Sequence, residues 1–122
     1  MITSEELRQR TKAFALRIIK LSESMPKSQA SYVIAKQVLR AGTSVAANYR
    51  AACRARSRAE FISKLGVVKL GVVVEEIDET LFWLELIVDA HLLPSSRMKA
   101  IIDEANQLTS IFVAARKTSR SR

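Results

Sequence analysis

The chain has 122 residues, of which 48% are hydrophobic and 26% are charged, with three glycines and two prolines. This length and composition fit one folded domain and exclude a largely disordered chain or two domains. Twenty lysines and arginines against twelve acids give a net charge of +8, which favours a polyanionic partner, with nucleic acid ahead of an anionic membrane.

The first half of the chain predicts two helices. The first begins at residue 3 or 4, because Thr3 and Glu6 have the spacing of a capping box, and it ends near Ser24. Ser28 can cap the second helix, whose stripe of apolar and small residues continues to an arginine-rich turn near Ser57.

Ser57 is predicted to cap the third helix, with Glu60 three residues further on, and this helix is apolar on more than one face. One seam advances in steps of three and four, as in a helical bundle, through Val67, Leu70, Val74, Ile77, Leu81, Leu84 and Val88. A helix of a small monomeric bundle needs only one apolar stripe, so the surplus predicts burial against another subunit. We assign this oligomer interface to Val68, Val72, Val73, Trp83 and Ile87. The alternative is that long neighbouring helices of the same chain cover these faces.

The fourth helix starts at Pro94 or Ser95, since proline is tolerated in a first turn, and keeps an apolar stripe to Ala115. The sequence shows neither the alternation of a strand nor glycine-rich turn pairs. We therefore predict an all-α fold, an up-down-up-down antiparallel four-helix bundle over residues 1–116. Residues 117–122 are expected to form a basic, flexible tail.

Charges are sorted along the middle of the chain. Six basic residues and the single acid Glu60 lie between Arg50 and Lys69, whereas six acids and no basic residue lie between Glu75 and Asp89. The basic block is suited to a polyanion, and the acidic block to pairing within the bundle or between subunits.

Glu75 and Glu79 lie within an otherwise apolar seam, where an unpaired carboxylate would be strongly unfavourable. If the preceding turn centres near Ser57, antiparallel residues that face each other have numbers summing to about 114. This rule predicts a polar layer of Gln37, Arg40, Glu75 and Glu79 that fixes the register of the helices or orders a subunit contact. The same rule places Asn48, the remaining polar candidate, opposite Gly66, where an amide could form a hydrogen bond across the pair. Exposure of both glutamates to solvent is the alternative.

The residues that catalysis or metal binding would need are not grouped in the sequence. The one histidine, His91, lacks the Glu-x-x-His spacing of a di-metal bundle, and Cys53 has no base near it. Gly66 and Gly71 stand alone within a helix, so they form no phosphate-binding loop. We expect a protein that is not an enzyme and that holds neither metal nor cofactor.

Arg50, Arg54 and Arg58 repeat every four residues and therefore line one stripe of a continuous helix, joined by Arg56 at the turn and followed by Lys64. Guanidinium groups bind phosphates through forked donation, in a way that is sensitive to salt and tolerant of sequence. Few aromatic residues are near, so contact with the backbone is favoured over base readout. The alternative is a solvated helix end whose cations complement the helix dipole.

A cytoplasmic location is expected from two further features. The single cysteine excludes an internal disulfide, and the amino terminus lacks the residue order of a signal peptide. The longest apolar stretch, residues 65–74, is much shorter than the roughly 20 residues that span a bilayer. We expect no membrane-spanning segment.

Three blocks carry a resemblance to a known family: QVLRAGTSVAAN at 37–48, RARSRAEFISKL at 54–65 and EIDETLFWLEL at 76–86. They resemble the 23S rRNA intervening-sequence protein family, whose members also include the accessory variability determinant of diversity-generating retroelements. The resemblance implies a homopentamer of four-helix bundles with a basic surface. For the retroelement branch it implies binding of RNA or DNA and association with a reverse transcriptase.

These features favour a noncatalytic, homo-oligomeric bundle that binds the backbone of RNA or DNA. The competing interpretation is a protein-interaction scaffold whose basic face docks an acidic partner protein.

Overall fold

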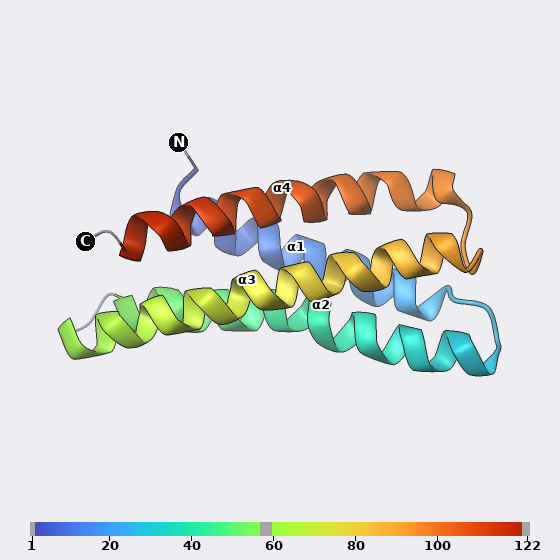
Figure 1. Cartoon of the computed structure of the whole chain (residues 1–122), viewed down its shortest axis with the longest axis horizontal. Coiled ribbons are helices and arrows are strands. Elements are labelled where there is room, and N and C mark those ends of the chain that lie inside the picture. The colour runs from blue at the N-terminus through green and yellow to red at the C-terminus, as the bar shows by residue number, and fades with distance from the viewer. Residues whose placement is uncertain (1, 57–59, 121–122) are drawn as a thin grey trace.

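Four helices make up the described part of the chain: α1 (Ser4–Glu23), α2 (Gln29–Arg56), α3 (Glu60–Asp89) and α4 (Ser95–Arg120). This computed structural model describes residues 2–56 and 60–120, and the side chains of these residues apart from 56, 60–65, 119 and 120. No strand occurs within those ranges, so the prediction of an all-α fold with four helices is confirmed. Figure 1 shows that each helix runs opposite to the one before it.

Polar side chains fix the starts of the first two helices where the sequence predicted them. Thr3 and Glu6 form a complete capping box, in which each side chain accepts the other residue's main-chain N–H at 3.0 Å. The hydroxyl of Ser28 accepts the main-chain N–H of Ser31 at 3.1 Å, which caps α2. A cap of this kind contributes about 1 kcal/mol of stability. The predicted cap at Ser57 lies outside the described residues.

The end of α3 is closed by main-chain hydrogen bonds around His91. This residue has φ of 56°, and it is the only non-glycine residue with positive φ in the described part of the chain. The N–H of His91 donates to the carbonyl of Val88, and the N–H of Leu92 donates to the carbonyl of Ile87, both at 3.0 Å. These two bonds form a Schellman motif, a position at which glycine is the usual residue.

The carboxyl-terminal segment differs from its prediction. A flexible tail was expected from Lys117, but α4 continues as a helix to Arg120. The residues from Lys117 to Arg120 are polar or basic, and such residues are compatible with a helix once its inner face is packed.

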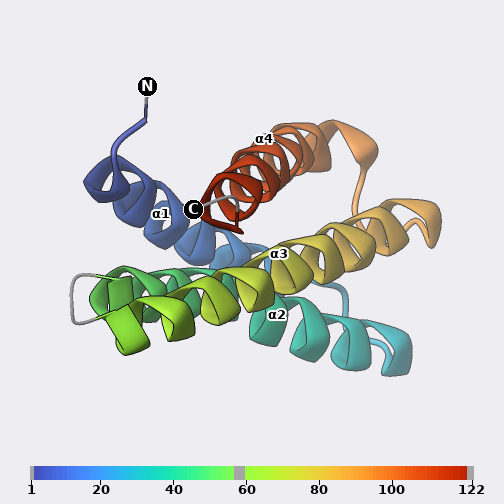
Figure 2. The same ribbon diagram turned by 60° about the vertical axis from the view of Figure 1, so that its left-hand side comes forward.

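The long α2–α3 pair forms one layer, with α1 packed on α2 and α4 packed on α3 (Figure 2). Contacts between α1 and α4 are few. A forked ion pair joins these two helices, because Arg10 donates two hydrogen bonds of 2.7 Å to Glu104 and a third, of 2.6 Å, to Gln107. The hydrogen bond to Glu104 is the main cause of a raised pKa at Arg10.

One apolar core runs through all four helices. Its largest fully buried side chains are Phe14, Ile18, Val38, Val45, Leu70, Val73, Ile77, Leu84, Ile87, Met98, Leu108 and Phe112.

The core corrects part of the predicted oligomer interface. Val73 and Ile87 were assigned to a subunit contact, but both are completely buried within the single chain. The seam of α3 that faces the core passes through Leu70, Val73, Ile77, Thr80, Leu84 and Ile87, because α3 packs on α2 along one side and on α4 along the other. This double packing covers a wider arc of the helix than one stripe.

Close packing of α1 on α2 depends on Gly42. A Cβ atom at this position would lie 2.8 and 2.9 Å from the two γ carbons of Ile18, which is itself fully buried. The two helices approach closely because residue 42 has no side chain.

Within the described residues, no helix combines the length and the hydropathy needed to cross a bilayer.

Candidate nucleic-acid interface

The predicted basic stripe lies partly within the described structure. Arg50 and Arg54 are exposed in the last two turns of α2. Arg58 lies outside the described residues, as do the side chains of Arg56 and Lys64. The structure therefore brings together the first two members of the predicted stripe.

The last turns of α2 lie at the same end of the molecule as the start of α1, the start of α3 and the end of α4 (Figure 1). We call this the basic end, because it gathers the cationic parts of the helices: Arg8, Arg10 and Lys12 of α1, Arg50 and Arg54 of α2, Lys69 of α3, and Arg116 and Lys117 of α4. The acidic block at 75–89 occupies the other half of α3, which runs to the opposite end. The charge blocks seen in the sequence are thus separated along the long axis.

Tyr49, the aromatic residue nearest the stripe in sequence, is buried. Its ring packs on Phe112 of α4, with ring centroids 5.2 Å apart and planes tilted by 56°. A ring held in the core cannot stack on a base. The described structure therefore offers no aromatic side chain beside Arg50 and Arg54 from the position where the sequence suggested one.

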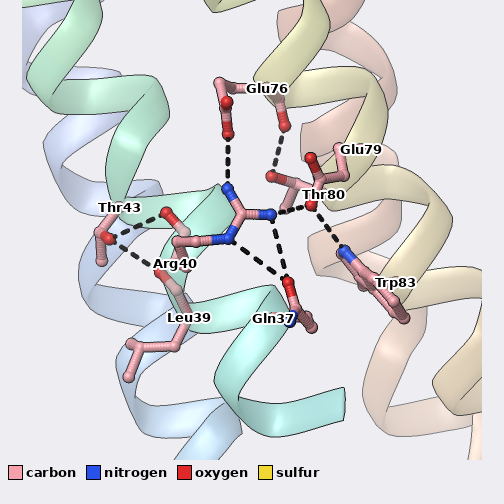
Figure 3. Close-up of polar contacts among 8 residues, drawn as sticks. All are labelled: Gln37, Leu39, Arg40, Thr43, Glu76, Glu79, Thr80 and Trp83. Carbon is pink, nitrogen blue, oxygen red and sulfur yellow. Dashed lines mark hydrogen bonds and ion pairs between the residues drawn. The ribbon is translucent and has the colours of Figure 1, made fainter. Parts of the chain in front are cut away.

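A cluster of polar side chains joins α2 to α3 near the middle of the pair (Figure 3). Arg40 is at its centre and forms ion pairs with Glu79 and, at 3.5 Å, with Glu76. Gln37 accepts from Arg40 at 3.3 and 3.4 Å, and the indole N–H of Trp83 donates to Glu79 at 3.0 Å. Arg40 is 49% exposed, so these pairs contribute about 1 kcal/mol or less to stability.

One residue of the predicted polar layer lies away from Arg40. Glu75 is exposed, and Glu76 occupies the place beside Arg40 that was expected for it. Glu75 and Glu76 are 100° apart around α3, so a rotation of the helix by less than that angle decides which of them is nearer to α2. Asn48, which the facing rule places opposite Gly66, is two turns beyond Arg40 on α2.

The outer face of α3 carries the remaining candidates for an oligomer interface. Val68 is 64% exposed, and Phe82, about four turns further along the helix, is 53% exposed. Val72 and Trp83 are half-buried, and the ring of Trp83 meets that of Phe82 edge to face at 5.0 Å. Along α3, Val68 and Val72 thus lie before the glutamates of the polar cluster, and Phe82 lies after them.

A hollow of about 490 Å³ between α1 and α2 was not anticipated from the sequence. Arg8 and Lys12 of α1 line one side of it, and Arg50 of α2 lines the other. The four-residue spacing of Arg8 and Lys12 was the available signal, because it places both on one face of α1.

Groups of three or more histidine, cysteine or carboxylate side chains that could hold a metal ion do not occur among the described residues.

The chain is similar to a protein family and to solved structures. A family model described as 23S rRNA-intervening sequence protein matches residues 4–114. A crystal structure of a protein with unknown function, from the S23 ribosomal protein family of Bacteroides thetaiotaomicron VPI-5482, is similar with a TM-score of 0.82 and 26% identity. That match covers 95% of this chain and 99% of the other. A search of curated proteins finds no match.

Proposed function

The chain belongs to the 23S rRNA-intervening sequence protein family, and on this premise we propose that it is a noncatalytic, homo-oligomeric protein that binds the phosphate backbone of RNA or DNA. The observation that carries the proposal is the exposure of Arg50 and Arg54 on successive turns at the basic end of the molecule. Arginine on a rigid helix presents its forked donors to phosphate at little entropic cost.

The positions of the acidic residues in α3 support the proposal that the basic end is the nucleic-acid interface. Apart from Glu60 at its first position, the acidic residues of α3 lie from Glu75 onward, in the second half of the helix, and two of them are engaged by Arg40. The basic end is therefore not neutralised by that block, and the whole chain keeps its net charge of +8. Such a surface attracts a polyanion through release of its counterions.

Assembly of several copies would place one basic end beside another. The exposed Val68 and Phe82 on α3 supply an apolar contact for a second copy, with the cluster around Arg40 between them. A ring of copies then multiplies the cationic surface of each chain. The resemblance to pentameric family members favours five copies.

The test measures the binding of a fluorescein-labelled, single-stranded RNA of about 16 nucleotides by fluorescence anisotropy as salt is raised. The wild-type protein is expected to bind with an affinity that falls steeply between about 50 and 200 mM salt. Arg50→Glu with Arg54→Glu is expected to weaken binding by about tenfold or more. The matched control, Arg97→Glu with Lys99→Glu, makes the same change in charge on exposed residues at the start of α4.

Two outcomes contradict the proposal: wild-type binding that does not depend on salt, and equal losses in both variants. Negligible affinity for nucleic acid, together with salt-sensitive binding of an acidic polypeptide such as polyglutamate, would favour the competing interpretation of a scaffold for an acidic partner protein. Association with a reverse transcriptase, which the resemblance to retroelement accessory proteins implies, is tested by co-purification with such an enzyme.

A further inference from the structure

The hollow between α1 and α2 has cationic walls and a floor of small residues. Ala46 and Ala47 of α2 line it together with Thr43. The Thr43 hydroxyl donates to the carbonyl of Leu39 at 2.7 Å, so its proton is held by its own helix. Small side chains leave room for a ligand to approach the helix surface closely.

Three cations from two helices surround this space. Arg8 and Lys12 are one turn apart on α1, a rise of about 6 Å along the helix, and Arg50 faces them from α2. Neither Lys12 nor Arg50 forms an ion pair with a carboxylate in the part of the chain that the structure describes. Their charges are therefore available to a ligand.

Arg8 is held at the rim by Glu5, which is the acid that lines the hollow. Glu5 also accepts a hydrogen bond from Gln9 at 3.1 Å. The bond from Gln9, followed by that from Arg8, lowers the pKa of Glu5, so this carboxylate is anionic at neutral pH. Glu5 thus orients Arg8 and at the same time competes with any anion for its guanidinium group.

We propose that this hollow is a phosphate-binding groove that holds successive phosphates of one nucleic-acid strand between Arg8, Lys12 and Arg50. The groove extends the interface of the proposed function, on which it rests, from α2 onto α1. Arg50 belongs to both surfaces, so a strand bound along the end of α2 passes directly into the groove. The turn-by-turn spacing of Arg8 and Lys12 lets two neighbouring phosphates be contacted at once.

The experiment compares Arg8→Ala with Lys12→Ala against the control Arg97→Ala with Lys99→Ala, using the labelled RNA. Both variants remove one arginine and one lysine, all exposed, from the full-length protein, and circular dichroism checks that each is folded. The groove variant is expected to bind about tenfold more weakly at low salt, and its slope of log affinity against log salt is expected to fall by one to two units. The control variant is expected to keep the wild-type slope.

A second variant, Glu5→Gln, has the opposite expected effect. It keeps the size of the side chain and removes the charge that competes for Arg8, so RNA is expected to bind several-fold more tightly than to the wild-type protein. Loss of affinity in this variant would contradict the proposal.

The outcomes distinguish a failure of the proposed groove from a failure of the proposed function. If the wild-type protein binds no RNA, the proposed function fails and the groove fails with it. If the wild-type protein binds RNA and the groove variant matches the control, the groove is overturned while the interface on α2 stands. Polyglutamate that binds as tightly as RNA, and is lost in the same variant, would show a site for carboxylates instead and would also overturn the groove.

Discussion

Gly42 and Gly71 both lie within helices, but only Gly42 lacks space for a side chain, so alanine substitutions at the two positions form a matched pair. At Gly42 a methyl group would collide with the buried Ile18, at 2.8 Å from its nearest γ carbon. At Gly71 the nearest atoms are those of the Arg116 guanidinium group, at 3.5 to 3.7 Å, which is ordinary contact. The same change therefore meets a packed core at one site and accommodating surroundings at the other.

Gly42→Ala is expected to destabilise the protein by about 1–2 kcal/mol, because overpacking of the core outweighs the better helix propensity of alanine. Gly71→Ala is expected to stabilise it by about 0.5–1 kcal/mol, because only the propensity changes. Urea denaturation followed by circular dichroism measures both. Equal shifts of the same sign in the two variants would show that the packing of α1 on α2 is looser than described.

At the residue scale, the sequence predicted which segments of α2 and α3 face each other better than it predicted which side of α3 faces α2. The facing rule placed Arg40 and Gln37 opposite Glu75 and Glu79, and the structure pairs Arg40 with Glu79. It also selected Glu75, whereas Glu76 contacts Arg40. Neighbouring positions on a helix differ by only 100°, and the phase of α3 depends on how α4 packs on it, which sequence spacing does not record.

The helix ends carry a prediction of their own, since α3 stops at a non-glycine residue in the left-handed conformation. An L residue with a side chain costs about 1–2 kcal/mol in that region, and His91 occupies it to complete the Schellman motif. His91→Gly is expected to raise the free energy of unfolding by about 1 kcal/mol, since glycine relieves this strain and loses more entropy on folding.

Ala90→Gly is the control for this effect. Ala90 is the preceding residue, is exposed, and does not have positive φ, so glycine there is expected to lower stability by about 0.5–1 kcal/mol. Thermal melts of the two variants should move in opposite directions. A destabilised His91→Gly protein would mean that the imidazole makes contacts that outweigh its backbone strain.

The helices themselves were predictable because their signals are local. A few neighbouring residues determine the caps at Thr3 and Ser28. The same holds for the breaks before the second and fourth helices. The inward face of α3 was not predictable in the same way, because every face of that helix offers apolar residues. Val73 and Ile87 became core residues through packing against two helices at once, which is a tertiary effect.

At the scale of the whole molecule, the outer face of α3 predicts the assembly of several copies. Val68→Glu with Phe82→Glu places two charges on that face and is expected to convert an oligomer into a monomer of 13.6 kDa. Light scattering coupled to size exclusion measures the mass of each protein.

The control for assembly is Leu16→Glu with Val113→Glu, which changes exposed apolar residues of α1 and α4 in the same way. This variant is expected to keep the mass of the wild-type oligomer. A wild-type protein that elutes as a monomer, or equal dissociation of both variants, would remove α3 as the interface.

The charge layout described along the long axis gives the molecule a permanent electric dipole. Neighbouring helices are antiparallel, so their backbone dipoles largely cancel, and the side chains decide the direction: positive at the end with Arg50 and Arg54, negative along the acidic half of α3. In the electric field of a polyanion, a protein with this dipole is oriented before contact. For the proposed binding of nucleic acid, low salt is therefore expected to accelerate association, because it lets the dipole orient the basic end toward the polyanion while the net charge attracts the protein.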